Sequence, residues 1–275
     1  MSSMIQISFY QVDAFTHRPF AGNPAGVCLL DFPLPPHLMQ AIAAEMNLSE
    51  TAFVQPPGPD GTRGLQWFTP TVEVPLCGHA TLATAHVLLR EAGAEPPLRF
   101  STLSGTLEVD ADEDGWLRMD FPADPPAPAP APEGLLAVLE CDATSPTELA
   151  TKGWIVRLAG EADVRKLSPD YGRLAGIPLG PTALGVIVTA PGEGEVDFVS
   201  RFFGPWVGVN EDPVTGMAHT MLGPYWARQK GKHELVARQV SARGGVLRVR
   251  VVGDRVHISG EALTVVKGEL SVPAG

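Results

Sequence analysis

The stretch Pro75-Leu-Cys-Gly-His-Ala-Thr-Leu-Ala-Thr-Ala-His-Val-Leu-Leu-Arg90 decides the architecture of this chain. Proline and glycine end the preceding strand, and about three turns of good helix formers follow. Because the segment 80–89 is apolar on most sides, we expect a buried central helix. His79 stands in its first turn, where unpaired N–H groups and the positive end of the helix dipole favour a bound carboxylate.

A later segment, Asp212-Pro-Val-Thr-Gly-Met-Ala-His-Thr-Met-Leu-Gly-Pro-Tyr-Trp-Ala227, repeats this layout. An offset of 138 residues, near half of the 275, separates the two copies and indicates a duplicated fold. The order helix, strand, strand, buried helix and strand meander also occurs twice, so we expect two similar halves with a cleft between the two helix starts. The residues that recur at this offset are Pro75, Gly78 and Ala80, matched by Pro213, Gly216 and Ala218.

The composition bounds the class of protein. Hydrophobic residues make up 44% of the chain, as in a globular protein with sizeable cores. A net charge of −11, spread along the sequence, argues against nucleic acid and anionic membranes as partners. No apolar run approaches the ~20 residues that cross a bilayer, and the first residues lack a secretory pattern, so we expect a cytoplasmic protein.

Three cysteines, at positions 28, 77 and 141, form no Cys-x-x-Cys pair, so the sequence indicates neither a disulfide framework nor a zinc site. Glycine-rich nucleotide-binding motifs and the Gly-x-Ser-x-Gly nucleophile elbow are also missing from the sequence. Nucleotide binding therefore has little support, and a serine hydrolase is not indicated.

The proline–alanine tract at residues 122–132 is the clearest boundary in the sequence. Such a tract is predicted to be a stiff spacer that joins neither a helix nor a sheet. It divides the chain into an N-terminal half, residues 1–122, a linker, residues 123–132, and a C-terminal half, residues 133–262. A last strand near residues 263–275 is expected to return to the first half.

Three residues are candidates for acid/base chemistry. His79 can bind a carboxylate or transfer a proton, or it can simply cap the helix. Glu50 lies between a helix and an apolar strand, where a carboxylate with a raised pKa could act as general acid or base, although a solvated loop glutamate is the more common case. Asp212 precedes the second helix, where an N-cap role and a functional role are compatible.

Cys77 is a further candidate, because a thiol near a helix N-terminus can act as a base. A two-base racemase on a duplicated scaffold would need a thiol at each helix start. The matching position holds Thr215, which argues against a symmetric two-thiol mechanism.

Five longer motifs are spread along the sequence: Phe20-Ala-Gly-Asn-Pro-Ala25, Met46-Asn-Leu-Ser-Glu-Thr-Ala-Phe-Val54, Glu73-Val-Pro-Leu-Cys-Gly-His-Ala-Thr81, Glu211-Asp-Pro-Val-Thr-Gly-Met-Ala-His219 and Gln239-Val-Ser-Ala-Arg-Gly-Gly245. Together they resemble the phenazine-biosynthesis PhzF-like family, and the resemblance covers almost the whole chain. It implies an α+β, diaminopimelate-epimerase-like fold with two rolled β-sheets, each around a central α-helix, and a site between the two domains. It also implies a homodimer and no cofactor or metal.

The resemblance also implies roles for individual residues. The best-understood member of the family moves a proton along the ring of trans-2,3-dihydro-3-hydroxyanthranilate, and Glu50, His79 and Asp212 match its functional motifs. The expected substrate-binding positions are Asn23, Gly78, Gly216 and Met217. Met217 departs from the family, which commonly has serine there.

We therefore expect a cofactor-independent isomerase that moves a proton on a small, cyclic substrate that bears a carboxylate. One alternative is an epimerase or dehydratase with Cys77 as one base. Another is a protein that binds small acids without catalysis.

Overall fold

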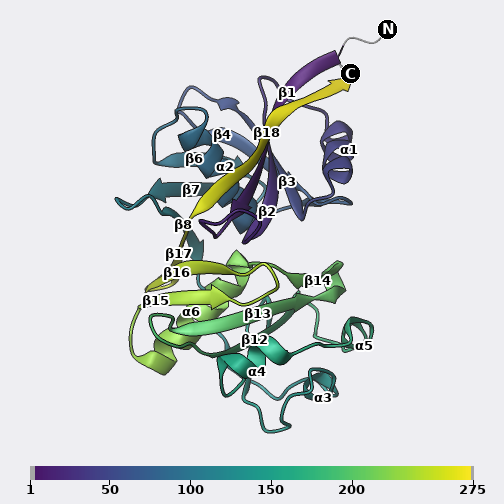
Figure 1. Ribbon diagram of the computed structural model, residues 1–275, viewed down its shortest axis with the longest axis vertical. Helices are drawn as coiled ribbons and strands as arrows, with labels where there is room; N and C mark the ends of the chain where they lie inside the picture. Colours follow the sequence, from purple (N-terminus) through teal and green to yellow (C-terminus); the bar gives the residue numbers. More distant parts are fainter. Residues whose placement is uncertain (1–3, 274–275) are drawn as a thin grey trace. The chain divides into compact units, whose positions relative to one another are not determined.

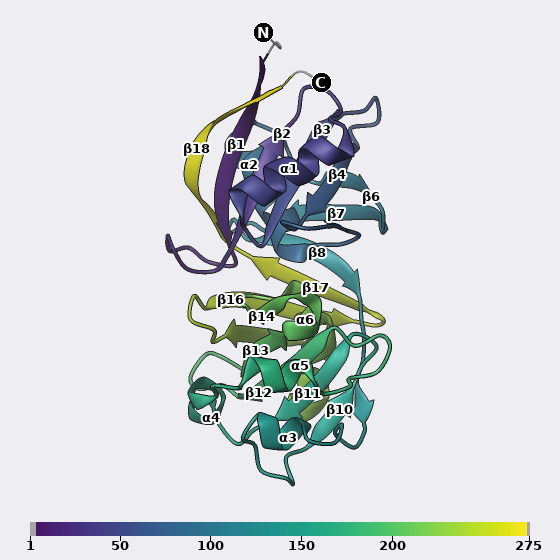
Figure 2. The ribbon, with the colours of Figure 1, turned by 90° about the vertical axis from the view of Figure 1, so that its right-hand side faces the viewer.

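A computed structural model describes residues 4–273, and the chain divides into two compact units (Figures 1 and 2). Unit 1 combines Met1–Asp120 with Ser259–Gly275, and unit 2 is Phe121–Ile258. The strand expected near residues 263–275 is β18, Ala262–Pro273, and residues 274 and 275 of that expectation lie outside the described part.

Unit 1 contains a mixed sheet in which β18 pairs with β1, and β1 with β2. The order continues through β3, β4, β6, β7 and β8, with the short β5 beside β4. The bounds of these strands are β1 Met4–Ala14, β2 Asn23–Leu29, β3 Glu50–Pro57, β4 Arg63–Phe68, β5 Glu73–Val74, β6 Leu98–Thr102, β7 Gly105–Ala111 and β8 Leu117–Pro122.

Two helices lie on opposite faces of this sheet: α1, Pro36–Met46, and α2, Gly78–Arg90 (Figure 1). Helix α1 is amphipathic and buries Met39, Ile42 and Ala43 in a core that includes Phe9 and Phe53 of the strands. Helix α2 packs against β1, β2, β3 and β18. Residues 79–85 and 87–88 of this helix are buried, as its composition predicted.

Unit 2 has the corresponding plan (Figure 2). Its strands follow the order β9, β10, β11, β12, β13, β15 and β16, with the short β14 beside β13. Strand β17 comes next along the chain. The bounds are β9 Ala127–Pro128, β10 Thr147–Leu149, β11 Gly153–Arg157, β12 Gly185–Pro191, β13 Phe198–Gly204, β14 Val209–Asp212, β15 Glu234–Gln239, β16 Gly245–Val252 and β17 Arg255–Gly260.

The short helices of unit 2 and the long α6, Gly216–Lys230, build separate parts of its core. Helix α6 packs on β15 and β16, and its Trp226 ring stacks on Phe198 with centroids 5.6 Å apart. The Trp226 indole Nε1 donates to the Thr189 hydroxyl (3.0 Å), which in turn donates to the Val199 carbonyl (2.6 Å). The short helices are α3 Leu135–Val138, α4 Glu161–Lys166, α5 Tyr171–Ala175 and the 3₁₀ turn Pro205–Val207.

The two units share one topology. In unit 1, β2 and β3 are parallel, β3 and β4 antiparallel, β4 and β6 parallel, and β6 and β7 antiparallel. The same alternation runs through β11, β12, β13, β15 and β16 in unit 2. In each unit the long helix precedes the fourth of these strands, and the two long helices begin 138 residues apart, at Gly78 and Gly216. The predicted duplicated α+β fold is confirmed.

The expectation that the proline–alanine tract joins no sheet is wrong at Ala127–Pro128. These residues form β9, which pairs with β10, and the next amide, of Ala129, donates to Thr147 O. Proline is tolerated in this position because a two-residue strand at a sheet edge needs few N–H donors. The tract thus lies within unit 2, whose first residue is Phe121.

Among the helices described, none combines the length and the apolar character that crossing a bilayer requires.

Candidate functional site

Three elements of unit 1 begin at the same place, and each contributes a polar side chain. Strand β2 starts at Asn23 and β3 starts at Glu50, and the two strands run parallel with Ala25 opposite Glu50. Helix α2 starts at Gly78, with Cys77 as its N-cap residue and His79 in its first turn. Parallel pairing puts the two strand starts at one sheet edge, and α2 begins there too.

His79 is the centre of this cluster. Its Nε2 lies 3.1 Å from Glu50 Oε2, and its Nδ1 lies 3.2 Å from the Asn23 side-chain amide and 3.5 Å from Cys77 Sγ. The His79 side chain is 7% exposed and that of Glu50 is 19% exposed, so the contact is largely shielded from water. A proton on Nε2 faces Glu50, and in that tautomer Nδ1 accepts from the Asn23 amide.

The ionisation of the cluster follows from its contacts. Burial alone would raise the pKa of Glu50, but the charge of His79 and hydrogen bonds with His79 and Cys77 lower it. Burial alone would lower the pKa of His79, but Cys77 and Glu50 raise it well above its usual value. Burial, and then the Glu50 charge, raise the pKa of the Cys77 thiol. The cluster therefore consists of the ionised Glu50 carboxylate, the His79 imidazole, which readily takes up a second proton, and the neutral Cys77 thiol.

The start of α2 also suits an anion. The Cys77 side chain makes no capping hydrogen bond, and the first turn contains no acidic residue. The Thr81 hydroxyl donates back to the Cys77 carbonyl at 2.6 Å. The first-turn N–H groups and the helix dipole favour a carboxylate near Gly78.

Unit 2 has a second polar cluster, at the start of α6. The Thr215 hydroxyl donates to Asp212 Oδ2 at 2.5 Å, and the Thr215 amide donates to Gln239 Oε1 at 2.9 Å. Gln239 is fully buried, and its Nε2 donates to the Asp212 carbonyl at 2.8 Å. Thr215 makes no N-capping bond, and the first turn of α6, with Gly216 and Met217, contains no acidic residue.

Gln239 is a residue of this second cluster to which the sequence analysis assigned no role. A buried glutamine with both ends of its amide bonded fixes the loop before α6 to the end of β15. The sequence contained one sign that Gln239 could matter, because this residue begins the last of the family-like motifs, Gln239-Val-Ser-Ala-Arg-Gly-Gly245.

Glu211, next to Asp212, is not a simple surface residue, although its polar neighbours favour that interpretation. Its carboxylate accepts two bonds from the Arg201 guanidinium, at 2.6 and 2.8 Å, and the Arg201 side chain is 9% exposed. Arg201 Nη1 also donates to the Leu167 carbonyl at 2.6 Å. This pair fixes β14, which carries Asp212, to the end of α4.

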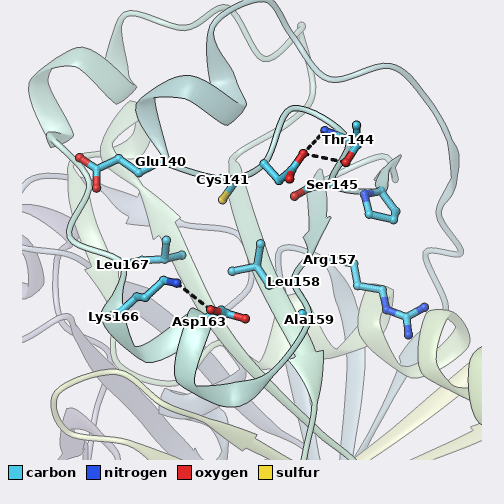
Figure 3. A pocket seen from close by; sticks show the side chains of 12 residues that line it. Glu140, Cys141, Thr144, Ser145, Arg157, Leu158, Ala159, Asp163, Lys166 and Leu167 are labelled. Atoms are coloured by element: carbon cyan, nitrogen blue, oxygen red, sulfur yellow. Dashed lines mark hydrogen bonds and ion pairs between the residues drawn. The ribbon is translucent and has the colours of Figure 1, made fainter.

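The remaining cysteines lie elsewhere. Cys28 is fully buried in the core under α1, and burial raises the pKa of its thiol. Cys141 lines a cavity of about 440 Å³ in unit 2 (Figure 3). Figure 3 shows Leu158 and Leu167 in this cavity, and an Asp163–Lys166 ion pair of 2.7 Å lies at its margin. As described, none of the site residues predicted from the sequence lines this cavity.

Comparison with known proteins agrees with this architecture. The family model described as "Phenazine biosynthesis-like protein" matches residues 12–268. A protein of Pseudomonas aeruginosa named an uncharacterized isomerase is 51% identical over 267 residues, which cover 97% of this chain and 99% of that protein. A crystal structure of a PhzF-family phenazine biosynthesis protein from Enterococcus faecalis has 43% identity and a TM-score of 0.90, with coverage of 97% of this chain and 99% of that chain.

A more distant solved structure, titled a predicted epimerase from Pseudomonas aeruginosa, shares the fold alone. Its TM-score is 0.72 at 22% identity, over 96% of this chain and 99% of that one. The sequence motifs, the duplicated topology and the family match over most of the sequence lead to one conclusion: this chain belongs to the phenazine biosynthesis-like, PhzF-related family.

Proposed function

We propose that this chain is a small-molecule isomerase that moves a proton on a cyclic, carboxylate-bearing substrate without a cofactor. The observation that carries the proposal is the 3.1 Å contact between Glu50 Oε2 and His79 Nε2. It lies at the start of α2, where the helix N-terminus favours a bound anion. The names of relatives, which include uncharacterized isomerases, support the reaction class.

The proposed reaction needs one base and one site for the substrate carboxylate. The N–H groups at Gly78 and His79 bind the substrate carboxylate, and Glu50 removes a proton from a carbon next to an activating group. The same carboxyl group then returns the proton to another carbon of the substrate. His79 holds Glu50 in its ionised form before the first step, and Asn23 orients the imidazole ring.

We propose a substrate-binding or acid/base role for the second cluster as well. Asp212 is the acidic residue of that cluster, and Thr215 and Gln239 fix its position through the bonds described above. Gly216 and Met217 present backbone N–H groups in the first turn of α6, as Gly78 and His79 do in α2. An Asp212→Asn variant keeps the shape and removes the charge, so it tests this part separately.

Glu50 is favoured over Cys77 as the base. The Cys77 thiol is buried, and both its burial and the Glu50 charge raise its pKa, which disfavours the thiolate form. The corresponding residue of unit 2 is Thr215, so a partner thiol for two-base epimerisation is missing from that helix start.

Proton exchange with solvent tests the proposal directly. The protein is incubated in D₂O with a set of small cyclic carboxylic acids, and deuterium incorporation is followed by mass spectrometry. Glu50→Gln removes the base and keeps the shape, so exchange should fall by about 10²–10⁴-fold. Glu45→Gln, a change at an exposed glutamate of α1, is the matched control and should exchange at the wild-type rate.

Two results would contradict the proposal. Exchange that persists in Glu50→Gln but disappears in Cys77→Ser would favour an epimerase with the thiol as base. Tight binding of an acid without any exchange would favour a binding protein, and there Met217 would mark a site that has lost a serine hydroxyl.

A further inference from the structure

The side chain of Gln239 contacts the loop before α6 at three points, all within unit 2. Its Oε1 accepts from the Thr215 amide at 2.9 Å. Its Nε2 donates to the Asp212 carbonyl at 2.8 Å and to the Thr215 hydroxyl at 3.2 Å. Gln239 is fully buried and Thr215 is buried, so water competes little for these bonds.

Two backbone groups of fixed polarity determine which way the Gln239 amide points. The Thr215 N–H can only donate, so it requires the amide oxygen, and the Asp212 carbonyl can only accept, so it requires the amide nitrogen. A flipped amide would place donor against donor and acceptor against acceptor. The amide nitrogen of Gln239 therefore also faces the Thr215 hydroxyl, to which it can only donate.

The bond from Gln239 sets the direction of the Thr215 hydroxyl. A hydroxyl has one proton, and Thr215 Oγ1 accepts from Gln239 on one side. Its own proton therefore points to Asp212 Oδ2, which lies 2.5 Å away, a length typical of a hydroxyl that donates to a charged carboxylate. A hydrogen bond donated to the ionised form of a carboxyl group favours that form.

Ser241, two residues after Gln239, holds the next carbonyl of the same loop. Its hydroxyl accepts from the Gly244 amide at 3.0 Å and donates to the Pro213 carbonyl at 2.7 Å. The end of β15 and the turn that follows it therefore fix the backbone on both sides of Pro213. This support keeps Asp212 and Thr215 at the separation that their short bond requires.

We propose that Gln239 is a positioning residue that acts through Thr215 and keeps Asp212 in its carboxylate form. Thr215 donates to Asp212 and does not accept from it, so Asp212 meets a substrate as a negative charge or a proton acceptor and not as an acid. The ionised state of Asp212 requires only the geometry of the cluster. Its effect on turnover rests on the proposed function, in which Asp212 has a binding or acid/base role.

A carboxyl titration without substrate tests the ionised state of Asp212. The whole chain is labelled with ¹³C at the aspartate carboxyl carbons, and the Asp212 signal is identified by its loss in Asp212→Asn. Thr215→Val removes the donor at nearly unchanged volume, so the midpoint at which this signal titrates should move to higher pH by about one unit. Thr215→Ser keeps a hydroxyl and should restore the wild-type midpoint.

Thr220→Val is the matched control, because Thr220 is as buried as Thr215 and its hydroxyl donates to the Met217 carbonyl instead of a carboxylate. It should leave the Asp212 midpoint unchanged. The other charges around the cluster are the same in all these proteins, so they cancel in the comparison. The charged and titratable side chains closest to the cluster in sequence or strand register are Glu211 of β14, Arg201 of β13, Arg238 of β15, His219 of α6 and Arg243 of the turn after β15.

The side-chain amide signals of glutamine test the bond from Gln239 to Thr215. In ¹⁵N-labelled protein the Gln239 signals are identified by their loss in Gln239→Met. Thr215→Val removes the acceptor of one Gln239 amide proton, so that proton should shift to higher field, while the proton that is bonded to the Asp212 carbonyl stays in place. Gln239→Met allows the Thr215 hydroxyl to turn, so the Asp212 midpoint should rise by less than in Thr215→Val. Circular dichroism confirms that each variant is folded, and the Thr215 variants decide the question if Gln239→Met does not fold.

An Asp212 midpoint that is the same in the wild type and Thr215→Val would overturn the proposal, and so would Gln239 amide protons that both ignore this change. The solvent-exchange assay, run across pH, separates these results from failure of the proposed function. The acid limb of its pH profile should move with the Asp212 midpoint in Thr215→Val and return in Thr215→Ser. A wild-type chain without exchange would refute the isomerase and leave the carboxyl titration standing. An exchange profile that stays in place while the midpoint moves would refute a role of the Asp212 charge in the reaction.

Discussion

His219 makes the stability of unit 2 depend on pH. The side chain is fully buried on α6 and stacks on Phe198 with ring centroids 5.9 Å apart. Its Nδ1–H donates to the Thr215 carbonyl at 2.8 Å, and its Nε2 has no hydrogen-bond partner among the described residues. Burial lowers the pKa of His219 from 6.5 to about 4. A proton on Nε2 would place a charge in an apolar core without an acceptor, so the folded state resists protonation.

The magnitude follows from the difference in pKa between the two states. The unfolded chain takes up the proton near pH 6.5 and the folded chain near pH 4, so acid favours the unfolded state in between. One pKa unit corresponds to about 1.4 kcal/mol. His219 should therefore reduce the free energy of unfolding by about 2 kcal/mol at pH 5 and by about 3 kcal/mol at pH 4, relative to pH 7.5.

Urea unfolding followed by circular dichroism at pH 7.5, 5 and 4 measures this effect. His219→Asn keeps a side-chain donor for the Thr215 carbonyl and cannot take up the proton, so the variant should lose less stability between pH 7.5 and 4 than the wild type, by about 3 kcal/mol. His37→Asn, at an exposed histidine of α1, is the control and should follow the wild type. Equal losses in the wild type and His219→Asn would refute the reasoning.

Three further changes test the packing described above, each by urea unfolding at pH 7.5. Thr189→Val leaves the buried Trp226 indole without its acceptor and should cost about 1–3 kcal/mol, whereas Thr189→Ser should restore most of the loss. Gly22→Ala should cost more than about 1 kcal/mol, because Gly22 has a φ of +65° and a Cβ there would lie 2.2 Å from the Ala14 carbonyl oxygen; a neutral result would contradict the tight approach. Glu211→Gln leaves a buried guanidinium without its counter-charge and should cost about 3 kcal/mol, and a cost below about 1 kcal/mol would mean that the ion pair contributes little.

The fold was predictable because its strongest signals are local. The proline and glycine before each long helix, followed by an apolar run, marked the starts of α2 and α6 at Gly78 and Gly216. Their constant offset indicated the duplication, which the matching sheet topologies then confirmed. Turn residues and hydrophobic periodicity depend only on residues that are close together in the sequence, so a single sequence is enough to recognise them.

The composition of each cluster was less predictable, because it depends on the pairing of distant strands. Asn23 and Glu50 come together through the parallel register of β2 and β3, which neither residue encodes locally. Glu211 has polar neighbours on both sides, and its partner Arg201 lies on the adjacent strand, so the ion pair was not visible in the sequence. Gln239 has a polar side chain typical of loops, yet it is fully buried.

The pairing of β18 with β1 also has a consequence for the order in which the chain folds during synthesis. Unit 1 contains residues from both sides of unit 2 in the sequence, with Ile5 opposite Val272 and Ala14 opposite Ala262. The ribosome completes residue 258 of unit 2 before it makes β18, although domains made first generally fold first. Until unit 2 and β18 have been made, the backbone groups of β1 that pair with β18 therefore have no partner. An unpaired strand edge of this kind can pair with another chain.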